Sequence, residues 1–197
     1  MRKLAVWTLA VALLASGCAT YHAGRLPSSD VSSFSNSQDQ DGLKVAVKMM
    51  DARESKQVFG VGRVAELYQP IYIAIDNRTK SSYEFKKRDL NKQSVPAEEV
   101  AKTCKFNTAG RATAYGVAGV FIWPLLIPAV VDGTGSANAN QKMESDYMYK
   151  EIQDTRIQPN GLLNGVVFVD KMKDGEEIAI RLHNTDTNEI KLFSFKK

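Results

Sequence analysis

The sequence contains few of the residues from which catalytic and metal centres are most often built. Its 197 residues include only two histidines and two cysteines. Neither a GxSxG nor an HExxH motif is present, and no cysteine is spaced with a histidine as in a zinc site or a catalytic pair. Two cysteines allow at most one disulfide, so a folded domain must be stabilised by an apolar core. We therefore expect a protein that is not an enzyme and that has no metal and no cofactor.

The first seventeen residues have the pattern of a secretory signal peptide. Arg2 and Lys3 precede the apolar segment 4–14, and the small residues 15–17 follow it. The apolar segment is too short to span a bilayer, which distinguishes it from a transmembrane helix. We predict that residues 1–17 are a signal peptide.

The stretch LLASGCAT places Cys18 directly after these small residues. It resembles the lipobox of bacterial lipoprotein precursors, with Ala15 where that family more often has leucine. The resemblance implies that Cys18 carries a diacylglyceryl group, becomes the new N-terminus and is acylated there, for example with palmitate. Each buried methylene contributes about 0.8 kcal/mol, so the lipid would be a stable membrane anchor. The alternative is an ordinary signal peptide or anchor in which Cys18 has no role.

The residue after the cysteine implies a location. Ala19 stands where an aspartate tends to retain such lipoproteins in the inner membrane. The resemblance therefore implies the bacterial outer membrane, with the protein lipid-anchored on its periplasmic face.

The charge of the chain gives no sign of a nucleic-acid partner. The complete sequence has a net charge of +4, but removal of Arg2 and Lys3 leaves 24 basic and 22 acidic residues, a net charge of +2. No zinc finger, RNA-recognition motif or basic helix is present. We expect no binding of nucleic acid.

Residues 18–42 are predicted to form a lipid-anchored flexible tether. From Tyr21 to Gly42 the chain is rich in serine, aspartate, glutamine and asparagine and has few apolar residues, a composition typical of unfolded linkers. A flexible chain of this length has a reach of about 26 Å, which would hold a domain clear of the membrane surface.

Residues 43–197 are predicted to form a β-sandwich domain that is long enough to bury a core. Apolar and polar residues alternate with a period of two at 43–49 and at 71–76, which predicts strands with one buried side. A turn at 77–81 is expected to return the second strand as a hairpin at 83–85. The side chains predicted to face the core are Leu43, Val45, Val47, Met49, Ile71, Ile73 and Ile75.

The C-terminal end repeats this pattern in three segments, 165–170, 176–184 and 189–195, with a turn after each of the first two. Because no strand–helix–strand rhythm recurs, these short strands favour an antiparallel sandwich. The segment IQPNGLLNGVVFVD also resembles a turn followed by a strand in Ig-like envelope domains. We predict an α+β fold, an immunoglobulin-like antiparallel β-sandwich with an inserted Gly/Ala-rich apolar helical hairpin.

The predicted helical insertion covers about residues 94–154. It contains the uncharged stretch 112–131, which Pro124 and Pro128 divide. Twelve helical residues before the first proline rise about 18 Å, against about 30 Å of bilayer hydrocarbon, so a membrane span is not expected. The stretch is either a buried hairpin or an exposed tip that contacts a membrane or a partner. The candidate contact residues are Phe121, Trp123, Leu125, Leu126 and Ile127.

One helix is predicted before this stretch and another after it. In the first, Ala97, Val100, Ala101 and Cys104 share one face, so Cys104 is expected to be a small buried residue rather than a reactive thiol. After a turn at Asp132–Gly133, a second helix is expected to begin with Ser136 as its N-cap and to extend to about Ile152.

These features leave two classes of function. The first is a noncatalytic interaction or assembly component of the bacterial envelope, attached to the membrane by its lipid and bound to other envelope proteins. The alternative is a carrier or binder of a hydrophobic ligand or lipid, held in a cavity lined by Phe121, Trp123 and Leu126. A hydrolase that uses unpaired acidic residues ranks behind both.

Overall fold

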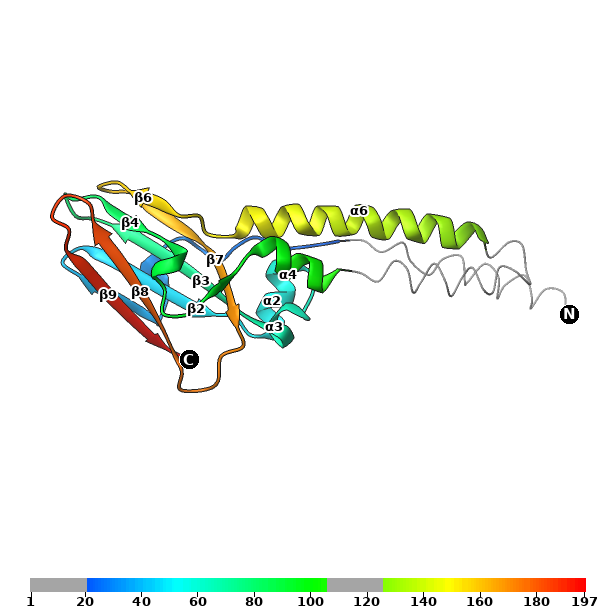
Figure 1. The fold of residues 1–197 in the computed structure, drawn as a ribbon, viewed down its shortest axis with the longest axis horizontal. Coiled ribbons are helices and arrows are strands. Elements are labelled where there is room, and N and C mark those ends of the chain that lie inside the picture. Colours follow the sequence, from blue (N-terminus) through cyan, green and yellow to red (C-terminus); the bar gives the residue numbers. More distant parts are fainter. Residues whose placement is uncertain (1–20, 106–125) are drawn as a thin grey trace, which may run out of the picture. The chain divides into compact units, whose positions relative to one another are not determined.

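The computed structural model describes residues 21–105 and 126–197, and the side chains of residues 126–136 are not among those described. The chain divides into two compact units. The larger unit comprises Ala23–Cys104 and Asp146–Lys197 and contains both β-sheets (Figure 1). The described part of the other unit is mostly the helix α6 (Leu126–Lys150), up to Ser145.

The larger unit is built from two antiparallel sheets. The strand order of the five-stranded sheet is β1 (Ser37–Gln40), β2 (Leu43–Met49), β3 (Tyr68–Asn77), β7 (Leu162–Asp170) and β5 (Ser94–Val95). The strand order of the four-stranded sheet is β6 (Thr155–Ile157), β4 (Tyr83–Phe85), β8 (Glu177–Asn184) and β9 (Ile190–Lys196). The prediction of an α+β protein with an antiparallel β-sandwich is confirmed at this level.

The core lies between the two sheets and follows the alternation seen in the sequence. Six of the seven predicted side chains on β2 and β3 are buried, and Met49 packs against them while partly exposed. Residues of the second sheet complete the core from the other side, among them Phe85, Ile180 and Phe193. Each fully buried large aliphatic or aromatic side chain contributes about 1.5–3 kcal/mol, so this core is the main source of stability.

The predicted pairing of neighbouring strands was partly wrong. β3 and β4 do not form a hairpin, because β3 lies in the five-stranded sheet and β4 in the four-stranded one. In the same way, β7 and β8 belong to different sheets, and only β8 and β9 form the expected hairpin. A period of two identifies the buried side of a strand but not the sheet to which the strand belongs.

The domain begins earlier in the chain than the predicted boundary at residue 42. Val31 is buried in a short 3-10 helix, η1 (Val31–Ser33), and β1 pairs with β2 over Ser37–Gln40. The polar sequence of β1 resembles a linker because β1 is an edge strand whose side chains are exposed or half-buried. Of the predicted tether, residues 18–20 lie outside the described residues.

Three short α-helices and a second 3-10 helix lie in the larger unit. α2 (Ala52–Phe59) begins with a capping box between Asp51 and Glu54, and α3 (Val64–Leu67) and η2 (Lys87–Asp89) are single turns. In α4 (Ala97–Cys104), the four predicted residues of the apolar face are all buried, which confirms that prediction. Within the predicted helical insertion, Ser94 and Val95 instead form strand β5.

The helix α6 differs from the prediction at its N-terminal end. It runs without interruption from Leu126 to Lys150, so the expected turn at Asp132–Gly133 and the expected N-cap at Ser136 are wrong. Pro128 is tolerated because it lies in the first turn, where main-chain N–H groups have no helical partner. None of the described helices is both long enough and apolar enough to cross a membrane.

The C-terminal end of α6 is fixed within the larger unit. Tyr147 stacks with Phe168, and its ring centroid is 4.8 Å from that of Phe59. Lys150 is only 4% exposed, and its Nζ donates to the main-chain oxygen of Val58 and to a carboxylate oxygen of Asp146, both at 2.6 Å. A buried ammonium group needs such partners, and these bonds together with the ring contacts hold this end of the helix against α2 and β7.

Candidate functional site

Most of the residues predicted to carry function lie outside the described part of the chain. These include the lipidation residue Cys18 and three of the candidate contact residues, Phe121, Trp123 and Leu125. Leu126 and Ile127 begin α6, but their side chains are not described. The candidate site is therefore built from the sandwich itself.

A groove of ≈ 780 Å³ lies at the end of the sandwich where β2 and β9 finish. Apolar side chains in its lining are Val47, Met49, Met50 and Phe34, and charged ones are Lys48, Asp51, Lys171, Lys196 and Lys197. The remaining lining comes from the segment 27–36, from the start of α2 and from Ala65 and Gln69. The groove thus combines apolar and basic groups, as a binding site for an anionic partner would.

Lysines in the groove carry more positive charge than nearby acids neutralise. The Nζ of Lys48 is 2.6 Å from Glu54, whereas those of Lys171 and Lys197 donate to the main-chain oxygens of Ala65 and Met172. Main-chain oxygens satisfy the donors without cancelling the charge. The one acidic side chain of the lining, that of Asp51, accepts from the N–H of Glu54 as the N-cap of α2.

Beside the groove, side chains of β1 link the edges of the two sheets. Gln38 Nε2 donates to the main-chain oxygen of Ser194 at 2.6 Å, and Gln40 Nε2 donates to that of Leu192 at 2.7 Å. These bonds occupy carbonyl groups on the outer edge of β9, which would otherwise be free to pair with another chain. The protected part of this edge ends at Ser194. Lys196, which lines the groove, lies beyond it.

An ion pair continues this connection away from the groove. Lys191 Nζ lies 2.8 Å from a carboxylate oxygen of Asp41. The hydrogen bond to Asp41 raises the pKa of Lys191, and the same bond lowers the pKa of Asp41. Both shifts favour the charged forms, so the pair persists over the physiological pH range.

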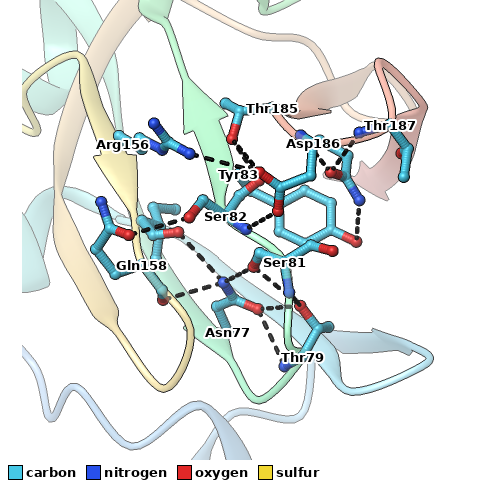
Figure 2. Close-up of polar contacts among 12 residues, drawn as sticks. Asn77, Thr79, Ser81, Ser82, Tyr83, Arg156, Gln158, Thr185, Asp186 and Thr187 are labelled. Carbon is cyan, nitrogen blue, oxygen red and sulfur yellow. Dashed lines mark hydrogen bonds and ion pairs between the residues drawn. The ribbon is translucent and has the colours of Figure 1, made fainter.

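At the opposite ends of these strands, a polar cluster joins three loops (Figure 2). Asn77 is fully buried, and its Nδ2 donates to the main-chain oxygens of Ser81, Ile157 and Gln158 at 2.8, 3.2 and 3.0 Å. Its Oδ1 accepts from Thr79. These groups satisfy one another, so the cluster holds the loops together rather than offering polar atoms to a ligand.

The third loop enters this cluster through Asp186. Its carboxylate accepts from the main-chain N–H of Ser82 at 3.1 Å and lies 3.5 Å from Arg156 (Figure 2). Asn184 Oδ1 accepts in turn from the N–H groups of Asp186 and Thr187. The crossing from β3 to β4 is thus fixed by side chains that a hairpin would not need.

His183 and the lysines of the basic run 86–88 form ordinary pairs with acidic side chains. His183 Nε2 is 3.3 Å from Asp89, Lys87 pairs with Glu151 at 3.0 Å, and Lys86 pairs with Glu84. In the described ranges, no group of three or more histidine, cysteine, aspartate or glutamate residues could hold a metal ion.

Cys104 is a buried free cysteine. Burial raises the pKa of its thiol to about 11, with smaller effects from Arg63 and Glu66. A thiol in this state is almost entirely protonated at neutral pH and is a poor nucleophile. This agrees with its predicted role as a packed residue of α4.

Comparison of the chain with protein-family models, with curated proteins and with solved structures gave no match.

The groove is the feature that the sequence analysis missed. Its basic residues come from three segments far apart in the chain, at residues 48, 171 and 196–197. Only the register of the two sheets brings them together, although each stands at or near the end of an alternating segment.

Proposed function

We propose that this protein is a lipid-anchored lipoprotein of the bacterial outer membrane and acts as a noncatalytic interaction or assembly component on the periplasmic face. Cys18 is its lipidation site, and its partners are other envelope proteins. The LLASGC motif and Ala19 support the anchor and the location. The folded unit would then bind partners close to the membrane.

The observation that carries the interaction role is the groove at the end of β2 and β9. It is open, it contains four lysines and one aspartate, and uncovered strand ends lie within it. Groups of this kind bind an anionic segment through charge and main-chain hydrogen bonds without chemical change. We infer that binding, rather than catalysis, is the task of this surface.

We also propose that the sandwich is immunoglobulin-like. The order β2-β3-β7-β5 in one sheet and β4-β8-β9 in the other corresponds to A-B-E-D and C-F-G of the constant-type immunoglobulin fold. β1 is an extra strand next to A, and β6 is an extra strand next to C. The helical hairpin and its contact residues stay part of this proposal, with α6 as the second arm.

A carrier of a hydrophobic ligand or lipid is the alternative. The predicted cavity residues Phe121, Trp123 and Leu126 do not bear on it, because their side chains lie outside the described part of the chain. What favours it is the apolar part of the groove, where Met49 and Phe34 are partly exposed. An acyl chain could contact these side chains.

Site-specific crosslinking in living cells tests the proposed function. A photo-crosslinking amino acid replaces Lys196 in the groove, and the control carries it at Lys80, an exposed residue of the loop after β3 that does not line the groove. We expect discrete protein adducts from residue 196 and none from residue 80. Adducts to lipid alone would favour the carrier, and equal adduct patterns at both residues would contradict an interaction role for the groove.

The anchor is tested separately by Cys18→Ala. We expect the variant to stay unprocessed or to become soluble, with loss of the mass of the lipid. Unchanged membrane fractionation and unchanged mass would contradict the lipoprotein assignment.

A further inference from the structure

The edge of β2 is uncovered over its last residues. Pairing with β1 ends at Ser37 opposite Ala46, and one further bond joins the N–H of Val47 to the oxygen of Asn36 at 3.0 Å. The chain before Asn36 then leaves the edge, and Phe34 stacks on Tyr72 with ring centroids 5.6 Å apart. Beyond Val47, no strand of the described chain lies beside this edge of β2.

Met49 presents its main chain to the groove. In an antiparallel ladder, the N–H and C=O of one residue point to the same side, and the side changes with each residue. The N–H of Met50 bonds to Pro70 of β3, whereas that of Val47 bonds away from β3. The N–H and C=O of Met49 therefore also point away from β3, toward the groove that Met49 lines.

β9 contributes a second uncovered end. The main-chain oxygens of Leu192 and Ser194 point toward β1, where Gln40 and Gln38 bind them. The same alternation turns the main chain of Lys196 toward the groove, past the end of β1. The groove is thus bounded by one free strand end from each sheet.

The charge around these ends is positive. Lys171, Lys196 and Lys197 have no carboxylate within ion-pair distance in the described residues, and all three are exposed. In a strand, every second side chain points to the same side. An extended segment with acidic residues at alternate positions would therefore direct its carboxylates to one wall of the groove.

We propose that this groove binds an extended acidic segment of another protein, which adds as a short strand beside Met49 while its carboxylates pair with the lysines. The inference rests on the proposed interaction function and names the surface and the chemistry of the partner. An anionic amphiphile would satisfy the lysines but would leave the N–H and C=O of Met49 without a partner. An added strand satisfies both.

Peptide binding to the full chain, held in nanodiscs of zwitterionic phosphatidylcholine, tests this proposal. The probe is a fluorescent seven-residue peptide in which glutamate and valine alternate. A second peptide has glutamine in place of glutamate, and a third has N-methylated amides on one edge. We expect the first to bind and the other two to bind at least about tenfold more weakly, because one lacks charge and the other lacks main-chain donors. Hydrogen exchange should slow in the fragment that contains Met49.

Variants of the protein give the matched controls. Lys196→Glu is expected to weaken binding of the acidic peptide about tenfold, whereas Lys80→Glu, outside the groove, leaves it unchanged. Met49→Pro removes an N–H that β3 does not use, so it should weaken binding about fivefold to tenfold while Met49→Ala does not.

Three results would overturn the proposal. They are equal binding of the N-methylated peptide to the unaltered protein, equal binding by Lys196→Glu, and slowed exchange at a surface other than β2. Saturable binding of dodecyl phosphate at Met49 without peptide binding would make the groove an amphiphile site instead. Protein adducts in cells from a surface outside the groove would leave the proposed function intact while this inference failed.

Discussion

Gly165 of β7 lies so close to Ile152 that a β-carbon at residue 165 would be 2.7 Å from both the nitrogen and the α-carbon of Ile152. The N–H of Ile152 bonds to the oxygen of Val166 at 3.0 Å, and Glu151 forms a parallel bridge to Val166. The segment after α6 therefore lies directly against β7. This contact needs a residue without a side chain, and it covers part of a sheet edge that β5 leaves free.

Gly165→Ala should destabilise the larger unit. The new methyl group would collide with main-chain atoms that cannot move independently, which we expect to cost about 3 kcal/mol. Urea denaturation measures the loss. The control is Gly62→Ala, where a β-carbon would have its nearest neighbour at 3.6 Å, and its midpoint should stay close to that of the unaltered protein. Equal midpoints for both variants would contradict the close contact between Gly165 and Ile152.

Asn77→Ala should also lower stability, by about 3 kcal/mol, because three main-chain oxygens in a buried place would lose their donor. Arg78→Ala changes the next residue, which is exposed, and is expected to stay within about 0.5 kcal/mol. Thermal denaturation of the two variants provides the comparison. A small loss for Asn77→Ala would mean that the loops hold together without this side chain.

The stability of the protein should depend on Cys104 at alkaline pH. The folded pKa of this thiol is about 11, above the value of about 8.5 for an unfolded cysteine. The unfolded chain therefore loses the proton first, and the stabilising contribution, complete below about pH 8.5, is lost as the pH rises through about 11. The denaturation midpoint should fall less steeply in Cys104→Ala than in the unaltered protein over this range.

The same burial should protect Cys104 from alkylation. Iodoacetamide at pH 8 is expected to modify it quickly only in denaturant. Rapid modification of the native protein would contradict both its burial and its raised pKa.

Serine substitutions at Trp123 and Leu126 separate the two interpretations of the uncharged stretch. If the stretch is core, each change removes large apolar area and should cost about 2–5 kcal/mol in a protein that begins at Ala19. If it is a contact surface, stability should barely change, and flotation with liposomes or recovery of a partner should drop. We predict the core result, and fully stable variants would contradict it.

The sequence predicts those parts of the fold that depend on local pattern. The buried sides of β2 and β3 and the apolar face of α4 follow from periods of two and of 3.6 residues. The placement of β3 and β4 in different sheets cannot be predicted from such periods, because it depends on the contacts of Asn77 with a loop about eighty residues away. The start of α6 was missed because a proline in the first turn resembles a break.

The candidate groove could not be predicted from the local sequence pattern, because it too depends on contacts between distant parts of the chain. Its lysines are unremarkable in sequence, and β1 looks like linker because an edge strand can be polar on its exposed side. The ends of β2 and β9 are uncovered only because β1 begins at Ser37, opposite Ala46, and because the side chain of Gln38 reaches no further along β9 than Ser194. Such a site arises where a few residues at the end of a strand have no neighbouring strand. No residue type in the sequence indicates that a strand end is unpaired.

The pairing of β3 with β7 has a consequence for how the chain reaches its native state. Tyr72 lies opposite Val166, almost half of the chain further on. Strands β1 to β3 can pair as soon as they are synthesised, but the central pair of the five-stranded sheet must wait for the late strand. Export through the predicted signal peptide would therefore deliver a chain whose apolar strands stay exposed until β7 and the later strands β8 and β9, which complete the core, have crossed. Folding would be slow and non-local, and a chaperone would be most useful during that interval.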